Sequence, residues 1–219
     1  MAAEGRSYRH GVRAIAPLTI AAAGFGVSFG LLARAAGWGW LAPIVMSATT
    51  FAGSAQFASA SIMSAGGTVA AAIAAGLLLN ARYAPIGVTV APWLEGPVWS
   101  RLLRAQLVVD ESWAIAAEGE GRYHPKVLVG AGVGLYVAWV AGTAIGSIGA
   151  QAIGDPSRFG LDAAFPALFL ALLVPQVRDR RALSAAVLGG AIALALTPVV
   201  PAGVSIVAAS VACLLGVRR

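Results

Sequence analysis

Apolar runs alternate along the whole chain with short segments that are polar or rich in glycine and proline. These runs predict helices at about residues 14–33, 41–64, 68–92, 102–117, 127–151, 161–177, 182–197 and 201–217. A straight helix needs about 20 largely apolar residues to cross a bilayer. The pattern therefore predicts an all-α integral membrane protein, a polytopic bundle of about eight transmembrane helices in a single domain over residues 1–219.

Three of the predicted spans are weaker than the others. Residues 102–117 carry Asp110 and Glu111 at their centre, and the last two runs are short, so they form a thin or a re-entrant hairpin. Seven spans are the alternative if 102–117 does not cross or 68–92 breaks. The pairs 14–33/41–64 and 161–177/182–197 share a weak similarity that suggests a possible inverted repeat, an arrangement common in transporters.

Composition and charge support a membrane protein and indicate its orientation. Hydrophobic residues make up 59% of the chain and charged residues 11%, whereas soluble domains carry about 25% charged residues. No basic patch with interleaved aromatic residues is present, so nucleic acid is not an expected partner. With eight spans, basic residues on the N-terminal side outnumber those on the other side, which predicts that both termini, including residues 1–13, are cytoplasmic. The two groups are Arg6, Arg9, Arg13, Arg122, Lys126, Arg178, Arg180, Arg181, Arg218 and Arg219 (ten) against Arg34, Arg101, Arg104 and Arg158 (four).

The second apolar run contains an unusually polar stretch between residues 46 and 63. Ser47, Ser54 and Gln56 lie close in sequence to Gly53, and Thr49 and Thr50 lie between Ser47 and Gly53. Polar, irregular backbone at membrane depth occurs where it is buried in protein or lines a cavity, so this stretch predicts a broken helix at a solute site. The alternative is that the small residues only allow close helix packing, although the amide of Gln56 still needs hydrogen-bond partners.

The third run contains a basic residue near the middle of a predicted span, Arg82, close to Asn80. Pro85 removes a backbone hydrogen bond near Ala81, so a second broken helix is expected here. A guanidinium within the membrane usually faces water or a partner. It either clamps a carboxylate of a bound solute or forms a structural ion pair with an acidic residue of another segment.

Three acidic residues are candidates for that ion pair and for carrying protons: Asp110, Glu111 and Asp162. A carboxylate at membrane depth is a candidate proton site because desolvation disfavours its charged form. Alternatively, Asp110 and Glu111 lie in water on an interfacial or re-entrant helix. Asp162, in the first turn of its helix, can simply stabilise the helix dipole.

Enzyme chemistry finds little support in the sequence. A Ser54–His124 pair for intramembrane hydrolysis requires a histidine at membrane depth, and both His10 and His124 lie outside the predicted spans. No cluster of His, Cys and carboxylate residues has metal-ligand spacing, and no phosphate-binding loop is present. No catalytic residue, metal or cofactor is therefore expected.

Four motifs, in this order, carry a resemblance to a known family: Phe51-Ala-Gly-Ser-Ala-Gln-Phe57, Leu78-Leu-Asn80-Ala-Arg82, Asp110-Glu111 and Phe159-Gly-Leu-Asp162-Ala-Ala-Phe-Pro166-Ala-Leu-Phe169. The chain resembles the AzlC-type branched-chain amino acid exporters over nearly its whole length. The resemblance implies a permease of the bacterial cytoplasmic membrane that exports leucine, isoleucine or valine. It also implies a small AzlD-type membrane subunit as partner. Tyr83 stands where the family often has histidine, which puts proton coupling in doubt.

The resulting hypothesis is a secondary transporter for neutral amino acids. Arg82, or backbone N–H groups near Gly53, would hold the carboxylate, polar side chains would hold the ammonium group, and aromatic residues and Met63 would surround the apolar side chain. The site residues so predicted are Phe51, Gly53, Ser54, Gln56, Phe57, Met63, Asn80 and Arg82. A passive channel, an intramembrane serine hydrolase and a non-transporting assembly subunit remain as alternatives.

Overall fold

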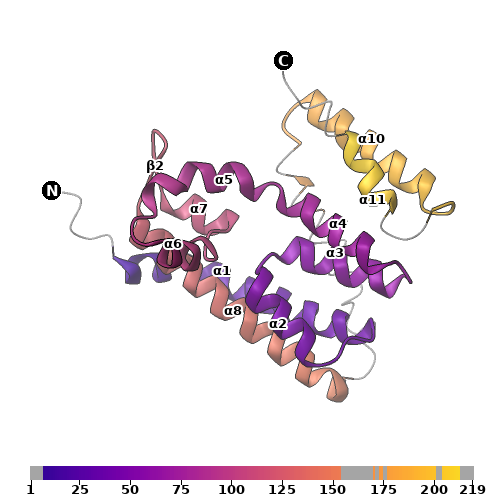
Figure 1. The fold of residues 1–219 in the computed structure, drawn as a ribbon, viewed down its shortest axis with the longest axis horizontal. Coiled ribbons are helices and arrows are strands. Elements are labelled where there is room, and N and C mark those ends of the chain that lie inside the picture. Colours follow the sequence, from indigo (N-terminus) through magenta and orange to yellow (C-terminus); the bar gives the residue numbers. More distant parts are fainter. Residues whose placement is uncertain (1–6, 154–169, 171–172, 175–176, 201–203, 213–219) are drawn as a thin grey trace.

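The structure, a computed structural model, describes residues 7–153, 170, 173–174, 177–200 and 204–212. Nearly all of the described elements are helices (Figure 1). In chain order they are α1 (Tyr8–Ala35), α2 (Leu41–Thr50), α3 (Gly53–Ser64), α4 (Val69–Asn80), α5 (Tyr83–Val90), the 3₁₀-helix η1 (Ala91–Trp93), α6 (Val98–Ala105), α7 (Asp110–Ala116), β1 (Ala117–Gly119), β2 (Arg122–Tyr123), α8 (Pro125–Ile153), α10 (Arg180–Leu196) and α11 (Val204–Ala209). The all-α class is confirmed, with one small β-hairpin, β1–β2, in the polar segment before α8.

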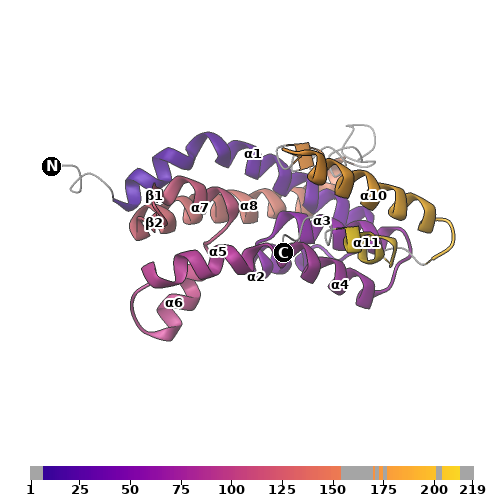
Figure 2. The same ribbon diagram turned by 90° about the horizontal axis from the view of Figure 1, so that it is seen from above.

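The two longest helices, α1 and α8, lie side by side over most of their length (Figures 1 and 2). Each carries a pair of glycines four residues apart that meets the pair of the other helix. A methyl group added at Gly26 would lie 3.3 Å from the carbonyl carbon of Gly142, and one at Gly30 would lie 3.0 Å from that of Gly146. Small residues at this spacing let helix backbones approach closely in membranes. Residue numbers increase on both helices from the first contact to the second, so the two helices run parallel.

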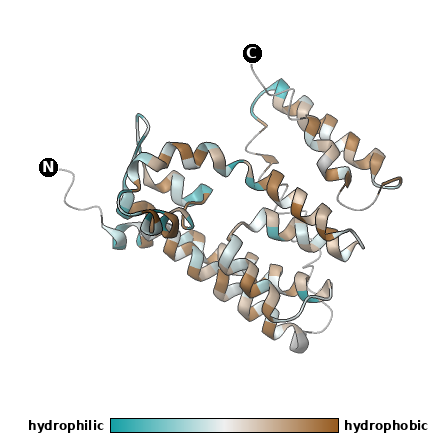
Figure 3. Cartoon of the chain, viewed as in Figure 1, coloured by the Kyte–Doolittle hydropathy of each residue, from teal (hydrophilic) through white to brown (hydrophobic). Residues whose placement is uncertain are grey.

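Length and hydropathy identify α1 and residues 125–150 of α8 as helices able to cross a membrane. The pair formed by α4 and α5–η1 would be a third span, bent by 44° at its break. Hydrophobic residues predominate along these helices, and hydrophilic residues are concentrated at the β1–β2 hairpin (Figure 3). The described residues thus support two or three spans and do not confirm a count of eight. The predicted span 161–177, on which the inverted repeat depends, lies almost wholly outside the described residues.

The polar stretch in the second apolar run does break its helix, but the break lies at Phe51 and Ala52 and not at Gly53. Phe51 ends α2 with a left-handed backbone (φ 42°), a conformation that costs a residue other than glycine roughly 1–3 kcal/mol. Gly53 is instead the first residue of α3. The predicted broken helix is therefore confirmed, and the residue assigned as its flexible point is corrected.

The predicted span over residues 102–117 is wrong. In its place α6 ends at Ala105, and the seven-residue α7 begins at Asp110, so neither helix is long enough to cross a bilayer. Asp110 and Glu111 lie in the first turn of α7, where negative charge is stabilised by the helix dipole. Ser112 accepts a hydrogen bond from the backbone N–H of Val109, 2.9 Å away, and this bond caps the helix start.

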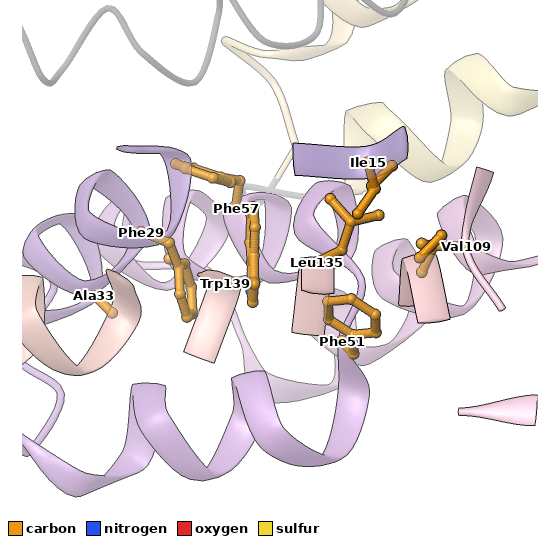
Figure 4. Close-up of a cluster of buried hydrophobic side chains, with 10 residues drawn as sticks. Ile15, Phe29, Ala33, Phe51, Phe57, Val109, Leu135 and Trp139 are labelled. Carbon is orange, nitrogen blue, oxygen red and sulfur yellow. The ribbon is translucent and has the colours of Figure 1, made fainter. Parts of the chain in front are cut away.

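Four of the ten buried residues in the core between α1, α3 and α8 are aromatic (Figure 4). The Phe57 ring packs edge-on against Phe29 and Trp139, with centroids 5.7 and 6.4 Å apart. Phe51 and Leu135 extend the same cluster toward the break between α2 and α3. The core therefore fixes the start of α3 against α8.

Candidate functional site

A cavity of about 200 Å³ lies where α1, α3, α5, α7 and α8 meet. This volume is below the roughly 300–1,000 Å³ of pockets that hold drug-sized ligands, so it suits a small solute. Apolar side chains form most of the wall, and polar residues enter from the two helix breaks and from α7. The lining residues are Leu18, Ala21, Ala22, Phe25, Phe51, Gly53, Ser54, Arg82, Tyr83, Val109, Asp110, Glu111, Leu135 and Trp139.

Arg82 enters the cavity from the break between α4 and α5. Its guanidinium pairs with the Asp110 carboxylate at 3.1 Å and donates a hydrogen bond to the Tyr83 hydroxyl, also at 3.1 Å. The two side chains of the ion pair are 36% and 38% exposed, so a solute in the cavity can reach them. The Nε–H of Arg82 is buried without a hydrogen-bond partner among the described residues. Among these residues, Arg82 therefore has an unsatisfied donor in the wall of the site, on a side chain that also lines the cavity.

Ser54 approaches the same cavity from the first turn of α3. The residue is 3% exposed, and its hydroxyl has no hydrogen-bond partner in the described part of the chain. A buried polar group in this state costs free energy unless a ligand or water satisfies it. The first N–H groups of a helix also lack intrahelical acceptors, so Ser54 lies where the backbone favours an anion.

Gln56 lies behind the cavity, fully buried, and every polar group of its side chain is used within the protein. Its amide oxygen accepts hydrogen bonds from the backbone N–H of Ala52 (3.2 Å) and from the indole N–H of Trp139 (3.0 Å). Its amide nitrogen donates to Ser47 at 2.7 Å, and the Ser47 hydroxyl also bonds that of Thr143. Gln56 thereby ties the broken helix to α8.

Aromatic rings provide the apolar walls of the cavity. The left-handed backbone of Phe51 places its ring against Tyr136 with a centroid distance of 5.1 Å. Gly53 makes room for Trp139, because a methyl group there would lie 2.7 Å from the indole ring. Phe25 lines the cavity from α1. Gly53 is therefore needed at the start of α3 for close packing against Trp139. The left-handed turn before it is made by Phe51 and uses no glycine.

The structure brings together part of the predicted site. Residues that line the cavity are Phe51, Gly53, Ser54, Arg82, Asp110 and Glu111. Gln56 and Phe57 lie in the core, and Met63 packs with Ile62, Ala72 and Ala75 in a separate cluster. The Asn80 side-chain oxygen is buried without a partner among the described residues, and Asn80 is not part of the lining. Asp162 lies outside the described residues.

The sequence interpretation missed the cavity roles of Trp139, Leu135 and Phe25. Only Trp139 carried a usable signal, because an indole N–H in the middle of an apolar helix requires an acceptor. For the hydrolase alternative, the described lining contains Ser54 and no histidine, while His124 lies before α8 and outside the lining. Within the described residues, no group of three or more His, Cys, Asp or Glu could hold a metal ion.

Comparisons with known proteins place this geometry in context. The family described as AzlC protein matches residues 17–153. An "Uncharacterized membrane protein" of Archaeoglobus fulgidus is 33% identical over 94% of this chain and 91% of its own length. The "Branched-chain amino acid transport protein AzlC" of Bacillus subtilis is 28% identical over 69% of this chain, a match that spans 60% of the Bacillus protein. An "Uncharacterized membrane protein" of Helicobacter pylori is 23% identical over 70% of this chain. No solved structure matches the chain.

Proposed function

Because this chain belongs to the AzlC protein family, we propose that it is a secondary transporter that exports neutral, branched-chain amino acids such as leucine, isoleucine and valine. The printed name of the Bacillus subtilis relative supports the solute class. The single structural observation that carries the proposal is the cavity. It combines apolar walls, an accessible Arg82–Asp110 ion pair and two buried polar groups without partners among the described residues, on Ser54 and Arg82.

The proposed binding mode follows from the charges around the cavity. The carboxylate of the amino acid accepts hydrogen bonds from the Nε–H of Arg82 and from the Ser54 hydroxyl at the start of α3. The ammonium group replaces Arg82 as a partner of Asp110, with Glu111 beside it. A zwitterion thus enters between two charges that pair with each other in the structure. Phe51 and the other rings surround the aliphatic side chain.

Of the remaining residues in the original hypothesis, Gln56 and Phe57 support the site from the core in this proposal. The hydrogen bonds of Gln56 are satisfied within the protein, so it has little capacity left for an ammonium group. Asn80 keeps an oxygen without a partner among the described residues and lies close in sequence to Arg82. We assign Asn80 to solute contact in another conformation of the transporter.

Direction and coupling are also part of the proposal. The parallel helices α1 and α8 both begin near basic residues, Arg9 and Arg13 for α1, and Arg122 and Lys126 for α8. The positive-inside tendency therefore favours a cytoplasmic position for both starts, in a bacterial cytoplasmic membrane. Asp110 and Glu111 are the proposed proton carriers. Asp162, which lies outside the described residues, stays a further candidate.

A small AzlD-type membrane subunit is the proposed partner, on the strength of family membership. Several helices expose large apolar side chains, including Ile20 on α1, Leu77 on α4 and Leu194 on α10. Lipid or a second membrane protein can cover such faces. Co-purification of the chain with the subunit from membranes would test this partner directly.

The deciding experiment measures efflux of preloaded leucine from cells that produce the chain alone or together with its small partner. Arg82→Ala should abolish the leucine efflux that the chain confers. Arg13→Ala is the matched control, because Arg13 is exposed on α1 and does not line the cavity, and it should leave efflux unchanged. Both variants are checked for equal abundance in the membrane.

Two results would contradict the proposal. Absence of leucine, isoleucine or valine efflux in every combination, with the chain inserted in the membrane, would reject this solute class. Efflux that is unchanged in Arg82→Ala would reject the site. Collapse of the proton gradient separates coupled export, which should stop moving leucine against its gradient, from a passive channel, whose downhill flux should persist.

A further inference from the structure

A second cavity, of about 370 Å³, lies between the α5–η1 segment and α6. Its wall is apolar except at Arg101 of α6 and the hydroxyl of Tyr83. The lining residues are Tyr83, Gly87, Val90, Ala91, Leu94, Val98, Arg101, Leu102, Ala105 and Val108. Like the first cavity, the second one is lined mainly by apolar residues together with one arginine.

Tyr83 lines both cavities and therefore lies between them. It is the first residue of α5, directly after the helix break, and its hydroxyl accepts a hydrogen bond from Arg82. The guanidinium carbon of Arg82 also lies 5.0 Å from the centre of the Tyr83 ring, a cation–π contact. Tyr83 is thus held by Nη2 of Arg82, while the proposed binding mode places the carboxylate on the Nε–H of the same guanidinium. Binding in the first cavity therefore acts on the side chain that holds Tyr83 between the two cavities.

Arg101 differs from its neighbour Arg104 on the same helix. Arg104 donates a hydrogen bond to the backbone oxygen of Glu95 at 2.9 Å, which holds the loop before α6. Within the described part of the chain, no carboxylate pairs with Arg101, although it lines the second cavity. Since α6 also buries no side chain, Arg101 is not held in place by packing of its helix. It is available for an anion in the cavity.

We propose that the second cavity is a further binding site for the same apolar amino acid, on the route between the first cavity and α6. Arg101 holds the carboxylate there, the apolar wall holds the side chain, and Tyr83 separates the two sites. This inference rests on the proposed function. The location of α6 beyond α5, away from α1, places the second site at the periphery of the fold (Figure 2).

Cysteine protection tests the second site separately from the first. Gly87 lines only the second cavity, and a side chain added there meets no atom within 4 Å, so Gly87→Cys fits the fold. Ala21→Cys reports on the first cavity. Gly39→Cys, in an exposed loop with open space around it, is the control. All three are made in a Cys213→Ala background, since Cys213 is the only cysteine of the chain.

The measured quantity is the rate at which a small neutral thiol reagent modifies each cysteine in membranes, with and without leucine. At about ten times its dissociation constant, bound leucine should slow modification of Gly87→Cys about tenfold. Arg101→Gln should remove this protection, while Arg104→Gln should keep it. Gly39→Cys should react at the same rate with and without leucine.

The remaining outcomes decide between the two proposals. Protection of Ala21→Cys with no protection of Gly87→Cys would overturn the second site and leave the first intact, in which case the groove beside α6 belongs to lipid. Protection of Gly87→Cys that persists in Arg101→Gln would overturn the role of Arg101. Protection at neither position, at leucine concentrations that saturate efflux of the parent chain, would overturn both sites.

Discussion

Replacing Gln56 by alanine tests whether this residue is part of the supporting structure or of the binding site. The substitution removes the acceptor of two buried donors, the backbone N–H of Ala52 and the indole N–H of Trp139. Each of these groups donates only, so the amide oxygen of Gln56 must face them. The hydroxyl of Ser47 keeps its bond to Thr143. We expect Gln56→Ala to destabilise the contact between α3 and α8.

The size of the effect follows from the two donors. A buried donor left without an acceptor costs about 1–3 kcal/mol, which predicts about 2–6 kcal/mol for the pair. Hydrogen bonds between membrane helices have measured values nearer 0.6 kcal/mol on average. Trp139 is only 8% exposed, so water can satisfy its N–H only in part. We therefore expect a loss of about 2–4 kcal/mol.

Reversible unfolding of the purified protein in mixed micelles measures this loss. Ser59→Ala is a suitable control, because Ser59 is also buried on α3 and, among the described residues, makes only one long side-chain hydrogen bond, 3.4 Å to the carbonyl of Ala72. The control should lose less than about 1 kcal/mol. Leucine affinity is measured on both variants at a temperature where each is folded.

Two results would refute the reasoning. If Gln56→Ala unfolds at the same denaturant concentration as the parent chain but binds leucine more weakly, Gln56 contacts the solute. Its bonds to Ala52 and Trp139 would then contribute nothing to the packing of α3 against α8. Equal losses of stability in Gln56→Ala and Ser59→Ala would likewise show that the satisfied amide has no special role.

Three further predictions follow from the same contacts. Ser54→Ala should weaken leucine binding about tenfold or more in equilibrium binding, by loss of a hydrogen bond to a charged group. It should not lower thermal stability, because the buried hydroxyl has no partner among the described residues; lower stability with unchanged affinity would contradict this. Gly142→Ala should destabilise the fold by about 1–3 kcal/mol through overpacking against the Ala23 backbone. Gly24→Ala, with open space around it, is the control and should be neutral or stabilising by up to about 1 kcal/mol. Equal unfolding midpoints of the two variants would reject the close α1–α8 contact. Asp110→Asn, which breaks the ion pair with Arg82, should raise the KM for leucine efflux and reduce the response of efflux to an imposed pH gradient; a normal response would remove Asp110 as a proton carrier.

The sequence by itself determined the helical membrane class and the places where helices are interrupted. Local pattern is sufficient for both, because apolar length sets what can cross a bilayer and polar groups at that depth must be sheltered by protein. The interruptions near Ser54 and at Arg82 were predictable for this reason. The same local pattern gave a wrong span at residues 102–117. Two adjacent acids in the middle of that apolar run mark the start of a short helix, α7.

Only the tertiary structure decided how these local features combine. The sequence left Arg82 with three candidate acids, and packing of α7 beside α5 selected Asp110. The sequence favoured Gln56 as a solute contact, and a tryptophan 83 residues later in the chain satisfies its amide instead. The break lies at Phe51, a left-handed residue where glycine is preferred locally, while Gly53 is used for close packing against Trp139. A sequence pattern records whether a residue is polar or apolar, whereas the partner of a polar group depends on which distant helices pack together.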